Sequence, residues 1–139
     1  MTELAYEDIK VGDEASLTRT ITEAHIVMYA GLTGDMNPVH MDAEDAAKSM
    51  FGERIAHGML VAGLISAVLG TQLPGPNSLY LGQDLKFTAP VKIGDTVRVT
   101  VSVTEKRDDK RIIKLRTTAA NQRGETVIDG TAVVKKMGL

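Results

Sequence analysis

Two side chains that can exchange protons stand close together in the first third of this 139-residue sequence. Asp35 follows a glycine, and His40 lies five residues further on. An Asp and a His often work as a general acid–base pair, because one group takes a proton while the other delivers one. Imidazole changes its charge near neutral pH, which suits either task. From the spacing alone, a turn-forming Asp and a structural His are the more frequent alternative.

The residues between the pair are typical of a turn. Pro38 favours a turn and keeps Asn37 out of helical geometry. Asn37 can in addition bind the backbone around the turn and hold Asp35 in place. The turn therefore predicts that Asp35 and His40 point to the same side.

Helical patterns flank this turn. Thr22 is suited to cap a helix whose apolar residues, beginning at Ile26, recur at three-to-four spacing, and Gly34 is suited to end it. A second, short helix is predicted to open at Asp42 and to end at Phe51-Gly52.

The stretch from Gly58 to Gly70 is apolar except for Ser66. It is shorter than the ~20 residues of a transmembrane helix, so it predicts a helix enclosed on all sides within the protein. If the helix begins at Gly58, its first backbone N–H groups lack helical partners and favour negative charge. They would form an oxyanion hole for a thioester or ester carbonyl. The alternative is a glycine needed only for close packing.

Two further residues of this stretch have alternative readings. His57 is either a second active group or a residue of the helix cap, and the cap is favoured. Ser66 is expected to bond back to the carbonyl of Ala62, with a place in the site as the less frequent alternative. The scattered histidines form no HxH or HExxH motif, so no metal site is expected.

The last sixty residues alternate between apolar and polar types, most cleanly at Val97, Val99, Val101 and Val103. With a short strand at residues 15–21, they predict about five strands. Helices early and strands late predict one α+β domain over residues 1–139. We expect a curved antiparallel sheet wrapped around the central apolar helix, which is the hotdog fold. An edge strand of such a sheet favours pairing with a second copy, so a homodimer is expected.

The composition excludes several classes of protein. The formal net charge is −2 without a basic cluster, and aromatic residues are 4% of the chain, so a nucleic-acid partner is not expected. The N-terminal residues lack the apolar segment of a signal peptide. The chain has no cysteine, which excludes disulfides and thiol chemistry and suits a reducing compartment. These features predict a cytoplasmic protein without a membrane partner.

The segment YAGLTGDMNPVH, residues 29–40, resembles the hydratase-2 motif of the MaoC-like family. The resemblance continues at residues 56–60, 79–83 and 87–91 and at Gly94-Asp95, and so covers nearly the whole chain. It is most similar to the (R)-specific enoyl-CoA hydratases that supply polyhydroxyalkanoate synthesis.

The resemblance implies a homodimer of hotdog domains that hydrates trans-2-enoyl-CoA reversibly to (R)-3-hydroxyacyl-CoA. It implies no metal or redox cofactor, with CoA as the carrier of the substrate. Asp35 and His40 would be the dyad that adds water in the syn sense, and the Gly58 amide would polarise the thioester carbonyl. Ser66 would line the site, and Asn37 would support the turn.

Other hotdog proteins are the alternatives. Acyl-CoA thioesterases and short acyl-carrier dehydratases often place a carboxylate on the central helix, and residues 58–70 contain none. A MaoC-type dehydratase acting on (R)-3-hydroxyacyl carrier-protein substrates would share the dyad, and a non-catalytic acyl-CoA-binding module would share the fold. The sequence leaves open the acyl chain length, the carrier, the pathway, and which member of the dyad is the base.

Overall fold

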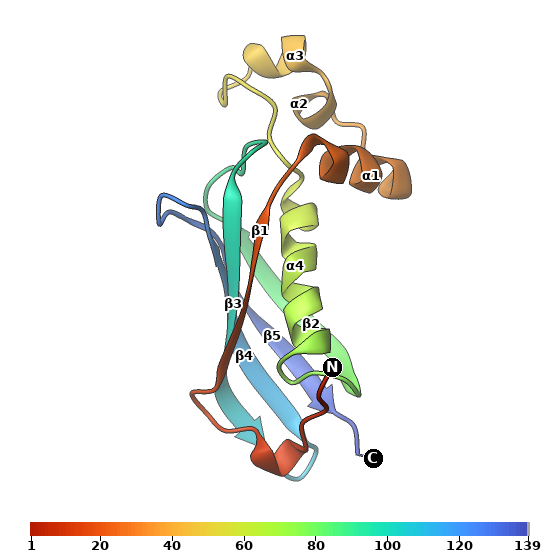
Figure 1. The fold of residues 1–139 in the computed structure, drawn as a ribbon, viewed down its shortest axis with the longest axis vertical. Coiled ribbons are helices and arrows are strands. Elements are labelled where there is room, and N and C mark those ends of the chain that lie inside the picture. Colours follow the sequence, from red (N-terminus) through yellow and green to blue (C-terminus); the bar gives the residue numbers. More distant parts are fainter. Residues whose placement is uncertain (139) are drawn as a thin grey trace.

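A five-stranded antiparallel sheet forms the body of the protein in the computed structural model, which describes residues 1–138 (Figure 1). The strand order is β1-β3-β4-β5-β2, and every pairing is antiparallel. Strands and helices together form an α+β hotdog domain, as predicted. The strands are β1 (Glu14–Thr20), β2 (Ser78–Phe87), β3 (Thr96–Arg107), β4 (Ile112–Ala120) and β5 (Thr126–Lys136). The helices are η1 (Tyr6–Asp8), α1 (Glu23–Thr33), α2 (Pro38–Met41), α3 (Ala43–Ala47) and α4 (Gly58–Thr71).

The core lies between the sheet and α4. The four alternating valines of β3 are all buried, which confirms that their face of the strand points inward. One side of α4 packs against this face through residues at helical spacing. That side consists of Val61, Ala62, Ile65, Val68 and Leu69.

The expectation that α4 is enclosed on all sides is wrong for the single chain. Met59, Gly63, Ser66, Ala67 and Gly70 are exposed on the helix side that faces away from the sheet. An apolar sequence indicates that a helix is buried. It does not indicate whether the residues that bury it belong to the same chain or to a second copy. This exposed side of α4 is therefore a surface that a second copy could bury.

The segment between α1 and α4 lies beyond one end of the sheet, at the top of Figure 1. The second helix does not run from Asp42 to Phe51-Gly52 as predicted. It is split into α2, with Pro38 at its first position, and α3, which ends at Ala47. Proline is tolerated at the start of a helix because the N–H it lacks has no helical partner there. Asp42 does cap α3, accepting the N–H groups of Glu44 and Asp45.

Strands β1 and β2 form the edges of the sheet. On β2, Leu79, Tyr80, Leu81 and Phe87 are exposed, and a bulge between Tyr80 and Gly82 interrupts the pairing with β5. An exposed apolar edge is a surface that invites pairing with another chain.

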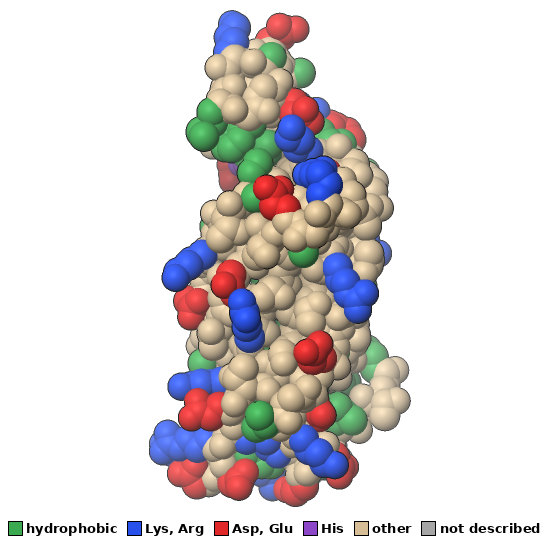
Figure 2. Space-filling model, turned by 90° about the vertical axis from the view of Figure 1, so that its left-hand side faces the viewer, with side chains coloured by type: hydrophobic (Ala, Val, Ile, Leu, Met, Phe, Trp, Pro, Cys, Tyr) green, Lys and Arg blue, Asp and Glu red, His purple; other side chains and the backbone are tan. Residues whose placement is uncertain are grey.

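The face of the molecule opposite α4 carries charges of both signs. Figure 2 shows Lys and Arg side chains interspersed with Asp and Glu over this face. A nucleic-acid footprint needs Lys and Arg gathered on one face, and this face does not provide it. Within residues 1–138, no helix combines the length and apolar character needed to cross a bilayer.

Candidate active site

Asp35 is placed by the way α1 ends. Gly34 adopts the left-handed conformation, with φ 79°, and its N–H donates to the carbonyl of Ala30. Glycine reaches this conformation without a steric penalty, so it ends the helix as predicted. The N–H of Asp35 then donates to Thr33 Oγ1 at 3.1 Å. Asp35 is thus held directly after the end of α1, and it is exposed in the single chain.

Asn37 connects Asp35 to α2. Its backbone N–H donates to Asp35 Oδ1 at 3.3 Å, and its own Oδ1 accepts the N–H of Val39 at 3.3 Å. The second contact is an N-cap for α2. Asn37 therefore makes the turn contacts that the sequence suggested, and its contribution to activity stays a prediction.

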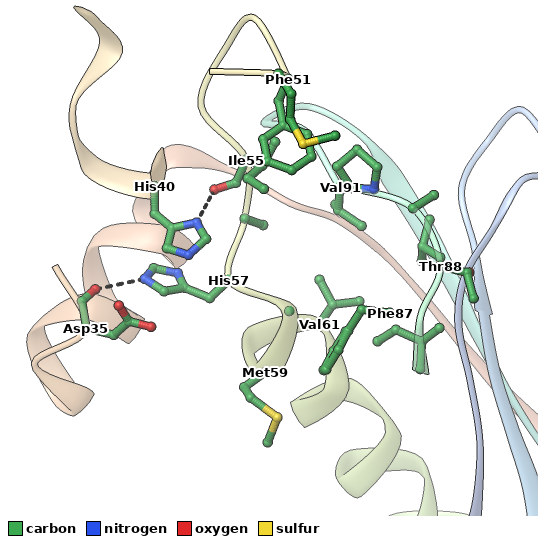
Figure 3. A pocket seen from close by; sticks show the side chains of 17 residues that line it. Asp35, His40, Phe51, Ile55, His57, Met59, Val61, Phe87, Thr88 and Val91 are labelled. Atoms are coloured by element: carbon green, nitrogen blue, oxygen red, sulfur yellow. Dashed lines mark hydrogen bonds between the residues drawn. The ribbon is translucent and has the colours of Figure 1, made fainter. Parts of the chain in front are cut away.

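His40 lies on α2 and points back toward the chain that leads into α4. Its Nδ1 lies 2.7 Å from the carbonyl oxygen of Ile55, and the residue is only 9% exposed (Figure 3). A carbonyl oxygen accepts only, so Nδ1 must carry a hydrogen. This leaves Nε2 as the ring nitrogen that can exchange a proton with a substrate.

His57 lies in the cap region of α4, as the favoured prediction has it, but its ring has other partners than the helix. It occupies the N-cap position of α4, but its side chain makes no capping hydrogen bond. Instead, Nε2 lies 2.9 Å from the backbone oxygen of Asp35. Its ring packs at a tilt against the rings of His40 and Tyr29, at centroid distances of 4.0 and 4.6 Å.

The fold thus gathers Asp35, His40 and His57, which each offer one atom within 4.8 Å of the others. The sequence offered His57 only as a less favoured second active group, and it suggested no metal ligands, whereas the cluster has the residue types of a three-ligand metal site. The same group can serve proton transfer without a metal. The expectation that the protein needs no metal stays a prediction.

Gly58 lies beside this cluster at the start of α4. The helical hydrogen bonds begin with Leu60 N–H, which donates to the His57 carbonyl, so the Gly58 N–H precedes them. A Cβ built at Gly58 would lie 2.7 Å from Cε1 of Phe87. The close-packing interpretation of this glycine therefore holds. The role of its amide in an oxyanion hole stays a prediction.

Asp35, His40, His57 and Gly58 all line one cavity of about 510 Å³. A volume of this size suits a small-molecule ligand. The rest of its lining is mainly apolar and comes from the loop before α4, from α4 itself, from the sheet and from the loop that follows β2 (Figure 3). These residues include Phe51, Ile55, Met59, Val61, Phe87, Pro90, Val91 and Ile128.

Ser66 does not line this cavity. It lies two turns further along α4, about 12 Å from Gly58 at the helical rise, and lines a second cavity of about 400 Å³. Met59 lines both cavities, so the two adjoin. The predicted place of Ser66 in the site remains a prediction that depends on how far a substrate extends along α4.

Sequence reasoning missed Arg54 as a supporting residue. Its Nε donates to the backbone oxygen of His40 at 2.6 Å, and its two Nη atoms bind the carboxylate of Glu23 at 2.8 and 3.1 Å. Arg54 therefore ties α2 to α1. No local sequence pattern predicts this contact, because Glu23 lies 31 residues away from Arg54 in the sequence.

An Asp–His pair and a helix N-terminus at one mainly apolar cavity are the parts that an enzyme of acid–base chemistry on a small molecule requires. The family model described as "MaoC like domain" matches residues 8–124. The chain belongs to the MaoC-like family of lyases.

Several proteins that are similar to this chain carry names that state an enzymatic activity. An (R)-specific enoyl-CoA hydratase of Rhodospirillum rubrum is 53% identical over 93% of this chain and 89% of its own. A 3-hydroxybutyryl-CoA dehydratase of Methylorubrum extorquens is 48% identical over 95% and 83%. The solved structure of an (R)-hydratase from A. caviae involved in PHA biosynthesis superposes with a TM-score of 0.91 at 44% identity, covering 94% of this chain and 99% of that one.

Proposed function

We propose that this enzyme adds water reversibly to trans-2-enoyl-CoA and forms (R)-3-hydroxyacyl-CoA. The observation that carries the proposal is the convergence of Asp35, His40 and Gly58 on one apolar cavity. Similar proteins named as (R)-specific enoyl-CoA hydratases support it.

The dyad moves the protons of one water molecule. As the water oxygen bonds to C3, one member of the pair takes a proton from it, and the other member gives a proton to C2. The proton that was taken then passes to the member that gave its own, which restores the starting state. His40 exchanges its proton through Nε2, because Nδ1 stays bonded to the Ile55 carbonyl. The reacting atoms of Asp35 and His40 lie within 4.8 Å of each other, so both can approach a substrate from the same side, which favours syn addition.

The Gly58 N–H stabilises the charge that develops on the thioester oxygen. Addition at C3 pushes electrons through C2 to that oxygen, which becomes an enolate. The first amides of a helix favour negative charge, and this interaction strengthens as the charge grows. Neither proton transfer nor this stabilisation needs a metal or a redox cofactor, so we propose that none is used.

The acyl group is expected to occupy the apolar part of the cavity. Phe51, Val61 and Ile128 offer surface to hydrocarbon and few polar partners. A short or medium acyl chain fits a cavity of about 510 Å³.

A second copy of the chain is expected to cover the exposed side of α4 and the edge strand β2. Met59 and Leu81 lie on these two elements and are about half exposed. Pairing of two β2 edges would satisfy unpaired backbone groups and bury apolar surface together. Light scattering coupled to size exclusion should therefore give twice the chain mass.

The direct test is hydration of crotonyl-CoA, followed by the loss of enoyl-thioester absorbance. We expect turnover by the wild type and an (R)-configured product. In Asp35→Asn and His40→Gln, kcat should fall by about 10²–10⁴-fold, the usual contribution of a general acid or base. Full activity in both variants would refute the assignment of the dyad.

Two other outcomes would point to other functions. Binding of acyl-CoA without turnover of any enoyl-CoA would indicate a binding module, and release of free CoA would indicate a thioesterase. Faster dehydration of (R)-3-hydroxyacyl carrier protein than of the CoA ester would assign the carrier instead. A series of enoyl-CoA chain lengths then defines the acyl preference.

A further inference from the structure

His57 has an unusual environment for a residue at the start of a helix. It is 2% exposed, and Nδ1 is buried without a hydrogen-bond partner within residues 1–138. An unsatisfied buried polar atom costs roughly 1–3 kcal/mol, so a histidine kept here needs an explanation in other contacts.

The first of these contacts is with the backbone of Asp35. The oxygen is a carbonyl, so Nε2 of His57 must donate the hydrogen of the 2.9 Å bond. The other bonds around Asp35 are local, to Thr33 Oγ1 and from Asn37 N–H. The His57 bond is different because it joins the turn to α4, 22 residues away in the sequence.

The second contact is through the ring faces. The ring of His40 lies 4.0 Å from that of His57 at an interplanar angle of 33°, and the ring of Tyr29 lies at 4.6 Å and 51°. The His57 imidazole is therefore packed by Tyr29 of α1 and by His40 of α2. In turn it fixes the plane in which His40 presents Nε2.

We infer that His57 is a positioning residue that sets the distances among the Asp35 carboxylate, the His40 imidazole and the Gly58 amide. The His57 ring donates to the backbone oxygen of Asp35 and packs against His40 (Figure 3). His57 is also the residue immediately before Gly58 in the chain. It does not transfer protons itself, because its free nitrogen is covered and its other nitrogen is bonded to a carbonyl. The inference rests on the proposed hydration reaction. A misplacement of about 1 Å among such groups costs up to 10²-fold in rate.

Three substitutions separate the hydrogen bond from the ring stack. His57→Gln keeps an N–H near the position of Nε2 and loses the ring. His57→Phe keeps the ring and loses the N–H. His57→Asn reaches only as far as Nδ1 and so provides neither contact.

We expect kcat for crotonyl-CoA to fall by about 10²-fold in His57→Asn and His57→Phe and by about 10-fold in His57→Gln. KM should stay within about threefold, because the apolar residues that line the rest of the cavity are unchanged. Equal losses in all three variants, or none in any, would overturn the hydrogen-bond role. A loss in His57→Gln as large as in His40→Gln would make His57 a proton donor or acceptor instead. Thermal unfolding of each variant identifies losses that come from misfolding.

A measurement without substrate tests the same geometry independently of the reaction. The chain has three histidines, so long-range ¹H–¹⁵N spectra of the wild type can assign each ring. We expect a hydrogen on Nε2 and none on Nδ1 in His57, and a hydrogen on Nδ1 in His40. A hydrogen on Nδ1 of His57 with Nε2 bare would overturn the inference. An inactive wild type with the expected tautomers would refute the hydration reaction and leave the geometry intact.

Discussion

Arg54 Nε donates a 2.6 Å hydrogen bond to the backbone carbonyl of His40, the residue that presents Nε2 to the cavity. Both Nη atoms of the same guanidinium donate hydrogen bonds to the carboxylate of Glu23. An arginine binds in this way because its planar fork presents several N–H groups in a fixed geometry. The position of His40 is therefore coupled to the start of α1.

The variant Arg54→Lys keeps the positive charge but loses the planar guanidinium that binds His40 and Glu23 together. The variant should be less stable by about 1–3 kcal/mol, the cost of leaving a buried acceptor unpaired. Its kcat should fall by between about 10-fold and 100-fold, because His40 shifts. Chemical unfolding and steady-state kinetics measure the two effects. Arg107→Lys, in an exposed pair with Asp109, is the control and should stay within about 0.5 kcal/mol.

Gly58→Ala should disturb the oxyanion hole through Phe87. The added methyl would lie 2.7 to 2.8 Å from two ring carbons of Phe87, so one of the two must move. We expect kcat to fall by about 10-fold or more, toward the ~10² that loss of one such donor costs. A Cβ at Gly31, inside α1, meets nothing within 4 Å, so Gly31→Ala should retain full activity. Adding Phe87→Ala to Gly58→Ala should restore part of the rate, and no recovery would argue against a steric cause.

The lowered pKa of Asp95 predicts that the folded protein loses stability in acid. Burial alone would raise its pKa, but hydrogen bonds from Gln122, from the Lys92 N–H and from Arg123 outweigh burial and lower the pKa. A lowered folded-state pKa stabilises the fold above the unfolded pKa of about 3.9, and this stabilisation is lost as the pH falls through the folded value. Asp95→Asn should therefore be less stable than the wild type at pH 7, by about 1–3 kcal/mol.

The difference between Asp95→Asn and the wild type should shrink below about pH 4. Urea unfolding at a series of pH values measures it. Asp109→Asn, at an exposed site, should show no comparable pH-dependent difference. A difference for Asp95→Asn that stays constant down to pH 2 would contradict the role of its charge.

Metal ions provide a prediction that separates two uses of the Asp35–His40–His57 cluster. Removal of metals with EDTA should leave hydration unchanged, because the proposed steps need only proton transfer and the Gly58 amide. Added Zn²⁺ should inhibit in competition with enoyl-CoA, since Nε2 of His40 and the Asp35 carboxylate line the cavity and are of ligand types that zinc binds. Loss of activity on EDTA treatment, restored by one metal, would instead make the cluster a catalytic metal site.

The sequence predicted the elements whose pattern is local. The alternation from Val97 to Val103 gave the inward face of β3, and Gly34 marked the end of α1. Helix α2 was missed because four residues are too short to show a helical period. Its Pro38, interpreted as a turn residue, stands at the one helical position where proline is well tolerated.

The contacts of the site were harder to predict because they join distant residues. Asp35, His40 and Gly58 carried recognisable motif signals. The bond from His57 to Asp35 and the packing of Phe87 on Gly58 depend on how α4 lies against the turn and the sheet. No periodicity encodes such contacts. The uncovered side of α4 was missed for a related reason, since the pattern of one chain does not specify its partner.

Asp35, His40, His57 and Gly58 lie within one continuous stretch of 24 residues that begins where α1 ends and stops at the first turn of α4. Most of this stretch lies beyond the end of the sheet (Figure 1). The sheet pairs its strands without contribution from the stretch, apart from the bridge between Ile55 and Lys92. The reacting groups and the paired strands therefore lie in separate parts of the chain. Substitutions of Asp35 and His40 can therefore remove the proton-transfer groups while every strand pairing of the sheet is kept.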